Sequence, residues 1–240
     1  MKAAKHAIRF SELDLVRGIG ILLVVVYHIF FDLTYFGFGN WTANPVVWAI
    51  GRLAAFLLIG VAGVSLSVSA KRWEGKNGAA WHHAKRVLVL AGVALLITLA
   101  TWIYPHNGFI FFGIIHFLAL ASLVGFLLGR SRTAVALLVI LSVPAWLWLQ
   151  TQNTNDVLLS ILGGRTGIYT LDLYAFFPWI GLFCAGMLIG DRMYAKEGRR
   201  IRFSPPTNWI LELMGQNSLA FYLLHQLAII GILMVLGIRA

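Results

Sequence analysis

Three side chains that could do chemistry follow one another at helical spacing near the start of the chain. Arg17 and His28 lie eleven residues apart, and Asp32 follows His28 by four residues. Eleven residues make about three turns, so Arg17 and His28 share a helix face at a separation of about 16 Å, and Asp32 continues that face. One helix therefore carries a cation, an imidazole and a carboxylate in sequence.

The segment that carries these residues is apolar enough to cross a membrane. An ionisable residue midway along a membrane helix is costly, which makes His28 a candidate functional residue. Asp32 can accept a hydrogen bond from His28 or from a neighbouring helix, and a paired imidazole is suited to act as a general base. A membrane histidine that only links two helices by a hydrogen bond is the alternative.

Composition restricts the class of protein. Of the 240 residues, 60% are hydrophobic and only 12% are charged, whereas a soluble domain carries about 25% charged residues. The chain is therefore expected to be an integral membrane protein in a lipid bilayer. The net charge of +10 does not indicate nucleic acid as a partner, because the basic residues gather in alternate loops. The single cysteine, Cys184, rules out an internal disulfide, and no metal site is expected.

Seven apolar runs are long enough to span, given the roughly 20 residues that a membrane helix needs. The runs are 17–38, 45–69, 86–104, 109–129, 133–150, 173–190 and 217–236. They predict an all-α fold, a polytopic bundle of about seven transmembrane helices that forms one domain over residues 1–240. A short amphipathic stretch, Trp209 to Met214, is expected to lie along the membrane surface before the last span. The longest outer segment, 151–172, could shape an acceptor site or be a plain surface turn.

The distribution of Lys and Arg predicts the orientation. Fifteen of them fall on the side of the N-terminus and two on the other side, which places the N-terminus in the cytoplasm and the C-terminus outside. The fifteen are Lys2, Lys5, Arg9, Lys71, Arg72, Lys76, Lys85, Arg86, Arg130, Arg132, Arg192, Lys196, Arg199, Arg200 and Arg202, and the two are Arg165 and Arg239.

Two polar residues lie about two turns inside the membrane from the outer side, Arg52 in the second run and His116 in the fourth. An arginine at that depth needs a carboxylate or a water-filled cavity. By depth Asp32 is the nearest candidate carboxylate, and Asp172 is the next. A structural ion pair between Arg52 and Asp32 is as compatible with the sequence as a functional role.

The last run carries a further polar face. Ser218, Tyr222, His225 and Gln226 are spaced by three, four or seven residues or are neighbours, so they share one broad side of the helix. Polar side chains on one side of an apolar helix point into the bundle or into a cavity. They are expected to support the site of His28, with hydrogen bonding between helices as the alternative.

The start of the first run could bind phosphate. Arginine suits bidentate phosphate contacts, and Gly18 and Gly20 next to Arg17 would let a ligand or another helix approach the backbone. The reach from Arg17 to His28 is comparable to an extended pantetheine arm, so an acyl-CoA could bind at Arg17 and present its thioester at His28. An ordinary interfacial arginine is the alternative.

Four segments in this order resemble the catalytic-domain family of heparan-alpha-glucosaminide N-acetyltransferase, within the transmembrane acyltransferases. The segments are Leu15–Leu33 with Arg17 and His28, Arg52–Ser67, Asp172–Gly190 with Pro178, and Gly215–Gln226. The resemblance extends over about residues 10–236. The chain departs from the family in being compact, since larger relatives have more helices. The paired-arginine motif of the wider acyltransferase group has no clear counterpart, only Lys71-Arg72 and Lys85-Arg86.

The resemblance implies transfer of an acyl group, usually acetyl, from acyl-CoA to a sugar or glycan, with acetyl-CoA as co-substrate and His28 as the participating histidine. Bacterial and archaeal relatives imply a prokaryotic cytoplasmic membrane, and a homo-oligomer is open. His28 would act as general base with Asp32, or be transiently acylated. The rival function is a proton-coupled small-solute transporter, because buried His, Asp and Arg also form proton relays. Clear repeats and broken helices, which transporters often have, are not found.

Overall fold

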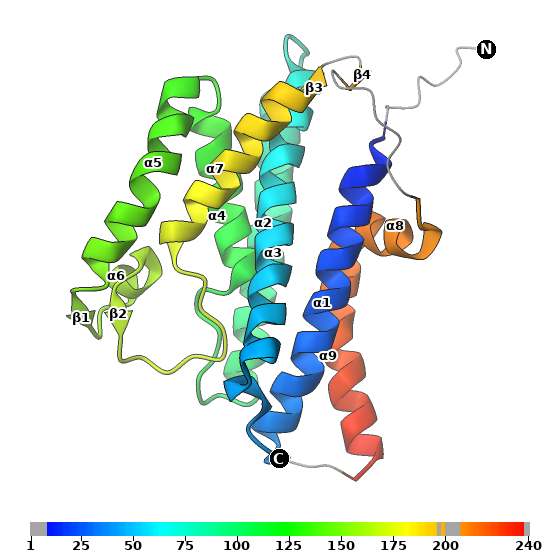
Figure 1. The fold of residues 1–240 in the computed structure, drawn as a ribbon, viewed down its shortest axis with the longest axis vertical. Helices are drawn as coiled ribbons and strands as arrows, with labels where there is room; N and C mark the ends of the chain where they lie inside the picture. Colours follow the sequence, from blue (N-terminus) through cyan, green and yellow to red (C-terminus); the bar gives the residue numbers. More distant parts are fainter. Residues whose placement is uncertain (1–8, 196–197, 200–206, 238–240) are drawn as a thin grey trace. The chain divides into compact units, whose positions relative to one another are not determined.

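The computed structural model describes residues 9–195, 198–199 and 207–237, most of which are helical (Figure 1). The chain divides into two compact units, one formed by residues 1–61 and 202–240 and the other by residues 62–201. Each unit is described by itself, and one domain over residues 1–240 stays a prediction. Six of the basic residues used to predict the orientation lie outside the described residues: Lys2, Lys5, Lys196, Arg200, Arg202 and Arg239.

Unit 1 is built on the first and last long helices. It contains α1 (Ser11–Tyr35), a short 3-10 turn η1 (Trp41–Ala43), the first half of α2 (Pro45–Trp73), α8 (Trp209–Gln216) and α9 (Ser218–Val235). Asn208 caps α8, because its side-chain oxygen accepts from the backbone N–H groups of Ile210 and Leu211. The predicted amphipathic stretch is therefore a helix of its own, and Figure 1 shows it lying across α1.

Small residues allow the helices of unit 1 to pack closely. A Cβ atom on Gly18 would lie 1.9 Å from the backbone oxygen of Leu211, and one on Gly215 would lie 1.8 Å from that of Asp14. Only glycine permits this approach of α1 and α8. The core of the unit follows this crossing along α1, where buried side chains of α1 and α2 meet: Ile21, Val24, Ala54 and Leu58.

Unit 2 holds the remaining helices. After the second half of α2 come α3 (Ala79–Ile103), α4 (Ile114–Leu128), α5 (Arg132–Leu149), α6 (Val157–Leu162) and α7 (Phe176–Met193). Two-residue strands pair as β1 (Asn153–Thr154) with β2 (Arg165–Thr166) in parallel, and as β3 (Tyr194–Ala195) with β4 (Gly198–Arg199) in antiparallel. The segment 151–172 is thus a folded connection between α5 and α7 that contains the short helix α6.

Two of the predicted spans begin later as helices than the sequence suggests. The segment before α4 is extended and pairs with the segment before α7, through a bridge between Phe112 and Leu173 and a hydrogen bond from Tyr174 N–H to the carbonyl of Phe112. Hydrophobic residues suit a buried extended segment as well as a helix, so an apolar run alone does not separate the two. As a result α4 is only 15 residues long.

At one end of unit 2 a cluster of ion pairs connects α2, α5 and α7. The ammonium of Lys71, at the end of α2, lies 2.7 Å from a carboxylate oxygen of Asp191 in α7 and donates to the backbone carbonyls of Asp191 and Tyr194. The other Asp191 oxygen pairs with Arg132 at the start of α5. The ends of three helices therefore meet at one point.

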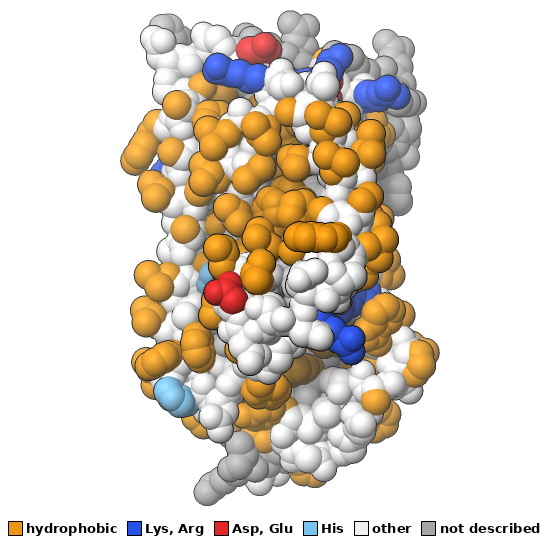
Figure 2. Space-filling model, turned by 90° about the vertical axis from the view of Figure 1, so that its left-hand side faces the viewer, with side chains coloured by type: hydrophobic (Ala, Val, Ile, Leu, Met, Phe, Trp, Pro, Cys, Tyr) orange, Lys and Arg blue, Asp and Glu red, His pale blue; other side chains and the backbone are white. Residues whose placement is uncertain are grey.

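The chain is a multi-pass membrane protein by the nature of its helices and by their surface. Five described helices are long and apolar enough to cross a membrane: α1, α2, α3, α5 and α9. In Figure 2 hydrophobic side chains cover much of the visible face, while Lys and Arg side chains lie at its upper end and in one further group lower down. On α5 the exposed residues include Ile140, Leu147 and Trp148. An apolar surface of this breadth is typical of contact with lipid.

Candidate functional site

Two histidines from the first and last helices of unit 1 meet edge to face. The ring centroids of His28 in α1 and His225 in α9 lie 4.8 Å apart, and the ring planes make an angle of 69°. Aromatic rings surround the pair, with Tyr27 and Phe31 beside His28 and Tyr222 beside His225. Two residues that the sequence placed on separate helices thus belong to one local group.

The hydrogen bond made by His225 shows which of its ring nitrogens carries the proton. His225 Nδ1 lies 2.6 Å from the carbonyl oxygen of Tyr222. A carbonyl oxygen only accepts hydrogen bonds, so Nδ1 is the donor, and in the neutral ring Nε2 keeps the lone pair. This Nε2 is buried and has no hydrogen-bond partner among the described residues. His225 therefore offers an unoccupied basic nitrogen whose orientation is fixed by the backbone.

Asp32 has its partner on the last helix. Gln226 Nε2 lies 2.8 Å and 2.9 Å from the two carboxylate oxygens of Asp32, which is buried. The sequence allowed several partners for Asp32, and the structure shows one on a neighbouring helix, Gln226. An ion pair between Arg52 and Asp32 stays a prediction; the contact described for Arg52 is with the ring of Trp48, 5.4 Å from its centroid.

Three buried polar atoms in this group have no hydrogen-bond partner in the described part of the chain. They are His28 Nδ1, His225 Nε2 and Gln226 Oε1. A buried polar group without a partner costs about 1–3 kcal/mol, so several in one place indicate a site that receives water or a ligand. The group contains acceptors and imidazole nitrogens, which suits proton transfer to and from a bound molecule. No three His, Cys, Asp or Glu side chains gather as metal ligands within the described residues.

The other predicted residues of the last helix have less direct positions. Tyr222 packs against the apolar core of unit 1 and places its ring 5.5 Å from that of His225. Ser218 is the first residue of α9, about two turns before His225. Tyr222 thus contributes through its backbone carbonyl and its ring, and the role of Ser218 stays a prediction.

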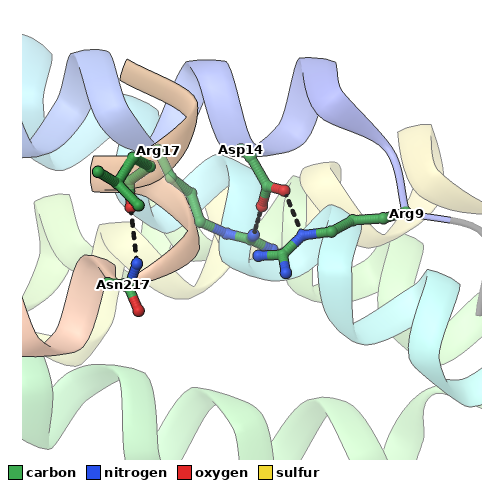
Figure 3. A network of polar contacts seen from close by, with 5 residues as sticks. Arg9, Asp14, Arg17 and Asn217 are labelled. Carbon is green, nitrogen blue, oxygen red and sulfur yellow. Dashed lines mark hydrogen bonds and ion pairs between the residues drawn. The ribbon is translucent and has the colours of Figure 1, made fainter. Parts of the chain in front are cut away.

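Arg17 is part of an ion-pair network at the other end of α1. Figure 3 shows the carboxylate of Asp14 between Arg9 and Arg17, at 2.6 Å and 2.7 Å. Asp14 is buried, Arg17 is three-quarters buried, and Arg9 is mostly exposed. The ion pairs of Asp14 with Arg9 and Arg17 were not predicted from the sequence. The available signal was an acidic residue three positions before a buried arginine, which is helical ion-pair spacing.

Gly18 and Gly20 face protein. The backbone of Leu211 fills the space beside Gly18, and the side chain of Leu58 fills the space beside Gly20. The sequence allowed either a ligand or another helix to approach these glycines, and the structure shows helices at both. Their predicted contact with acyl-CoA is not supported by this packing, and any role in binding is indirect, through the placement of Arg17.

His116 and Asp172 belong to unit 2, where both cap the start of α4. His116 Nδ1 accepts from the N–H of Gly113, so its Nε2 carries the proton and donates to Thr98 Oγ1 at 2.9 Å. The Thr98 hydroxyl in turn donates to the carbonyl of Ile110, and Asp172 accepts from the N–H of Ile114. These hydrogen bonds give His116 and Asp172 a structural role at the start of α4. Their predicted role in the site of His28 stays a prediction.

The fold and the polar group define a class: a multi-pass helical membrane protein with a histidine pair between its first and last long helices. A family model described as "Heparan-alpha-glucosaminide N-acetyltransferase, catalytic" matches residues 9–227. The match extends over most of the chain, and the chain belongs to this family, whose members are transferases. Comparison with curated proteins and with solved structures gave no match.

Proposed function

We propose that the protein moves an acyl group, in the first place acetyl, from cytoplasmic acyl-CoA to a sugar or glycan acceptor. Family membership supports an acetyltransferase that acts on a glycan. The observation that carries the proposal is the contact of His28 with His225, in which a ring nitrogen of each is buried and has no partner among the described residues. Such nitrogens can take a proton from an acceptor and return it to a leaving group.

In the proposed reaction the acceptor nitrogen or oxygen attacks the thioester carbonyl carbon. A bond forms between the acceptor and this carbon, and the C–S bond to CoA breaks. The proton that the acceptor loses passes to His28 and then to the CoA thiolate, so the products are the acylated acceptor and free CoA. In a second route a ring nitrogen of His28 attacks the thioester carbon, the C–S bond breaks and CoA leaves as the thiol. The acceptor then attacks the carbonyl carbon of the acyl-imidazole and releases the imidazole.

The neighbours of His28 would divide the remaining tasks. His225 lies beside it, with Nε2 directed by the Tyr222 carbonyl, and can share the proton. Arg52 is proposed to help stabilise the oxyanion that forms on the thioester carbonyl, as hydrogen-bond donors do in acyl transfer. His116 and Asp172 would act by holding the start of α4.

The donor is proposed to bind through its phosphates at Arg17. Two guanidinium groups and one carboxylate leave a net positive charge in the network of Arg9, Asp14 and Arg17. Arginine side chains match phosphate oxygens in geometry. The packing of α8 against Gly18 fixes the helix turn that presents Arg17. Arg17 and His28 lie on the same helix, so this arrangement also sets the distance from the phosphates to the thioester.

The proposed topology has seven spans, a cytoplasmic N-terminus and an outer C-terminus, in a prokaryotic cytoplasmic membrane. The ion cluster of unit 2 supports this orientation, because Lys71, Arg132 and Asp191 come from three connections predicted to lie on the cytoplasmic side and meet at one end. The predicted outer segments before α4 and α7 likewise pair with each other.

The test is acetyl transfer by the purified protein in lipid nanodiscs, with labelled acetyl-CoA and an amino sugar as acceptor. Loss of a general base typically lowers the rate by about 10²–10⁴-fold, so we expect His28→Asn to reduce turnover to that extent and to leave acetyl-CoA binding intact. His106→Asn is the matched control, because His106 is exposed, bonds to the Trp102 carbonyl and has a positive φ that asparagine tolerates. Equal turnover of the two variants would exclude the mechanism.

A further inference from the structure

The amide of Gln226 has a defined orientation. Its two hydrogen bonds run to the carboxylate oxygens of Asp32, which in the ionised state only accept, so the group that faces Asp32 is the –NH₂ group. The carbonyl oxygen Oε1 must then point away from Asp32. This oxygen is buried and has no hydrogen-bond donor among the described residues. Gln226 cannot satisfy it by turning over, because that would place Oε1 against the carboxylate.

The neighbouring histidine does not supply the missing donor. Gln226 follows His225 directly in α9, and the Nδ1 proton of His225 is already bonded to the Tyr222 carbonyl. In the neutral ring the remaining nitrogen, Nε2, is itself an acceptor without a partner. Two adjacent residues of α9 therefore each keep one buried lone pair without a donor among the described residues. A ligand that fits must bring at least two hydrogen-bond donors.

We propose that Gln226 binds the nucleophilic group of the acceptor, and that Asp32 is the positioning residue that orients it. The inference rests on the proposed acyl transfer. One N–H of an acceptor amine faces the histidine pair, and the second N–H donates to Gln226 Oε1. The amine nitrogen attacks the thioester carbon and the C–S bond breaks. One proton passes from the nitrogen through the histidine pair to the CoA thiolate, and the second N–H, held by Gln226, remains in the amide product.

This arrangement distinguishes amines from hydroxyls. A primary amine has two N–H groups and can satisfy both lone pairs, whereas a hydroxyl has one O–H and leaves either the imidazole or Gln226 without a donor. A site whose buried polar group is left unpaired discriminates strongly against the analogue that lacks the donor. Asp32 thus acts through Gln226, a role different from fixing the tautomer of His28.

The experiment compares an amino sugar with the same sugar carrying a hydroxyl in place of the amine, glucosamine against glucose, in the nanodisc assay. We expect Gln226→Leu to raise the KM for the amine about tenfold or more and to leave the KM for acetyl-CoA unchanged, since one buried hydrogen bond to the acceptor is lost. Selectivity for the amine over the hydroxyl should fall by a similar factor. Asn77→Leu, at an exposed amide in the connection between α2 and α3, is the matched control.

Exchanging the carboxylate and the amide between positions 32 and 226 tests whether Asp32 positions Gln226 or has only a structural role. Gln226→Glu alone places two carboxylates together and should impair acceptor binding. Combined with Asp32→Asn, it restores an amide-to-carboxylate hydrogen bond and keeps an acceptor oxygen at position 226, so we expect the acceptor KM to return toward the native value. This double variant also serves if Gln226→Leu does not fold, as judged by thermal unfolding.

The outcomes are distinct. No acetyl transfer by the native protein to any acceptor would refute the proposed function and this inference with it. Transfer by the native protein, together with a native acceptor KM in Gln226→Leu, would refute only the inference and indicate water at Oε1. Equal impairment by Asp32→Asn/Gln226→Glu and by Gln226→Glu alone would also refute it.

Discussion

Replacing Gly18 with alanine tests the crossing of α1 and α8 on which the position of Arg17 depends. The new Cβ would lie 1.9 Å from the backbone oxygen of Leu211, whereas real Cβ contacts under 3.0 Å are essentially never seen, so α8 must retreat by at least the difference of 1.1 Å. The obstacle is backbone and cannot rotate away. Overpacking of this kind costs about 1–3 kcal/mol, and we expect Gly18→Ala near the upper end of that range.

The matched control is Gly231→Ala in α9 of the same unit, where nothing lies within 4 Å of the added Cβ. Alanine is favoured over glycine inside a helix by about 0.5–1 kcal/mol, so this variant should be slightly stabilised. The assay is reversible unfolding in mixed micelles, followed by the KM for acetyl-CoA, which should rise only in Gly18→Ala. Equal stability of the two variants would show that α8 does not pack against α1 as described.

The remaining predictions concern the two ion-pair networks. Lys71→Met should destabilise unit 2 by about 2–4 kcal/mol in the same unfolding assay, because Lys71 is largely buried, while Arg132→Met, at an exposed arginine, should cost less than about 1 kcal/mol. Burial raises the pKa of Asp191, but hydrogen bonds and charges of Lys71 and Arg132 outweigh it, so its pKa lies below the ordinary 3.8. Its contribution to stability is therefore present above pH 3.8 and lost as the pH falls through the lowered pKa. In Asp191→Asn the free energy of unfolding should depend less on pH in that acidic range. A double-mutant cycle of Asp14→Asn and Arg17→Gln should give a coupling energy above about 1 kcal/mol, and a value near zero would show that the pair is not formed.

Much of the fold follows from the apolar pattern. Each of the seven apolar runs contains a helix, because about twenty hydrophobic residues without breakers satisfy their backbone hydrogen bonds internally. The ends were less predictable. The first helix begins at Ser11, six residues before the apolar run, because the polar turn is held by contacts of Asp14 with arginines. The run 109–129 begins as an extended segment because it pairs with another segment. That partner lies about 60 residues away in the chain, so the local pattern does not show it.

The candidate site was likewise predictable within single helices but not between them. Helical spacing identified His28, Asp32, His225 and Gln226, because it depends only on positions within one helix. Which residues meet depends on how α1 and α9 pack, and neither the contact of the two histidines nor the bond from Gln226 to Asp32 could be chosen from spacing alone. The sequence weighed Arg52, His28 and a neighbouring helix as partners of Asp32, and only coordinates distinguish among these.

The unpaired atoms of unit 1 argue that its polar group is maintained for a function. Three buried polar atoms without partners among the described residues, at about 1–3 kcal/mol each, amount to a large part of the 5–15 kcal/mol that stabilises a typical protein. Replacing His225 with leucine would remove part of that cost at little change of volume, whereas leucine at position 226 would leave the buried carboxylate of Asp32 without its hydrogen bonds. A site that instead keeps such lone pairs without a donor is explained if water or an acceptor amine occupies it during the reaction cycle. The same reasoning predicts that His225→Leu stabilises the protein while it lowers acetyl transfer, and a variant that loses both stability and activity would refute it.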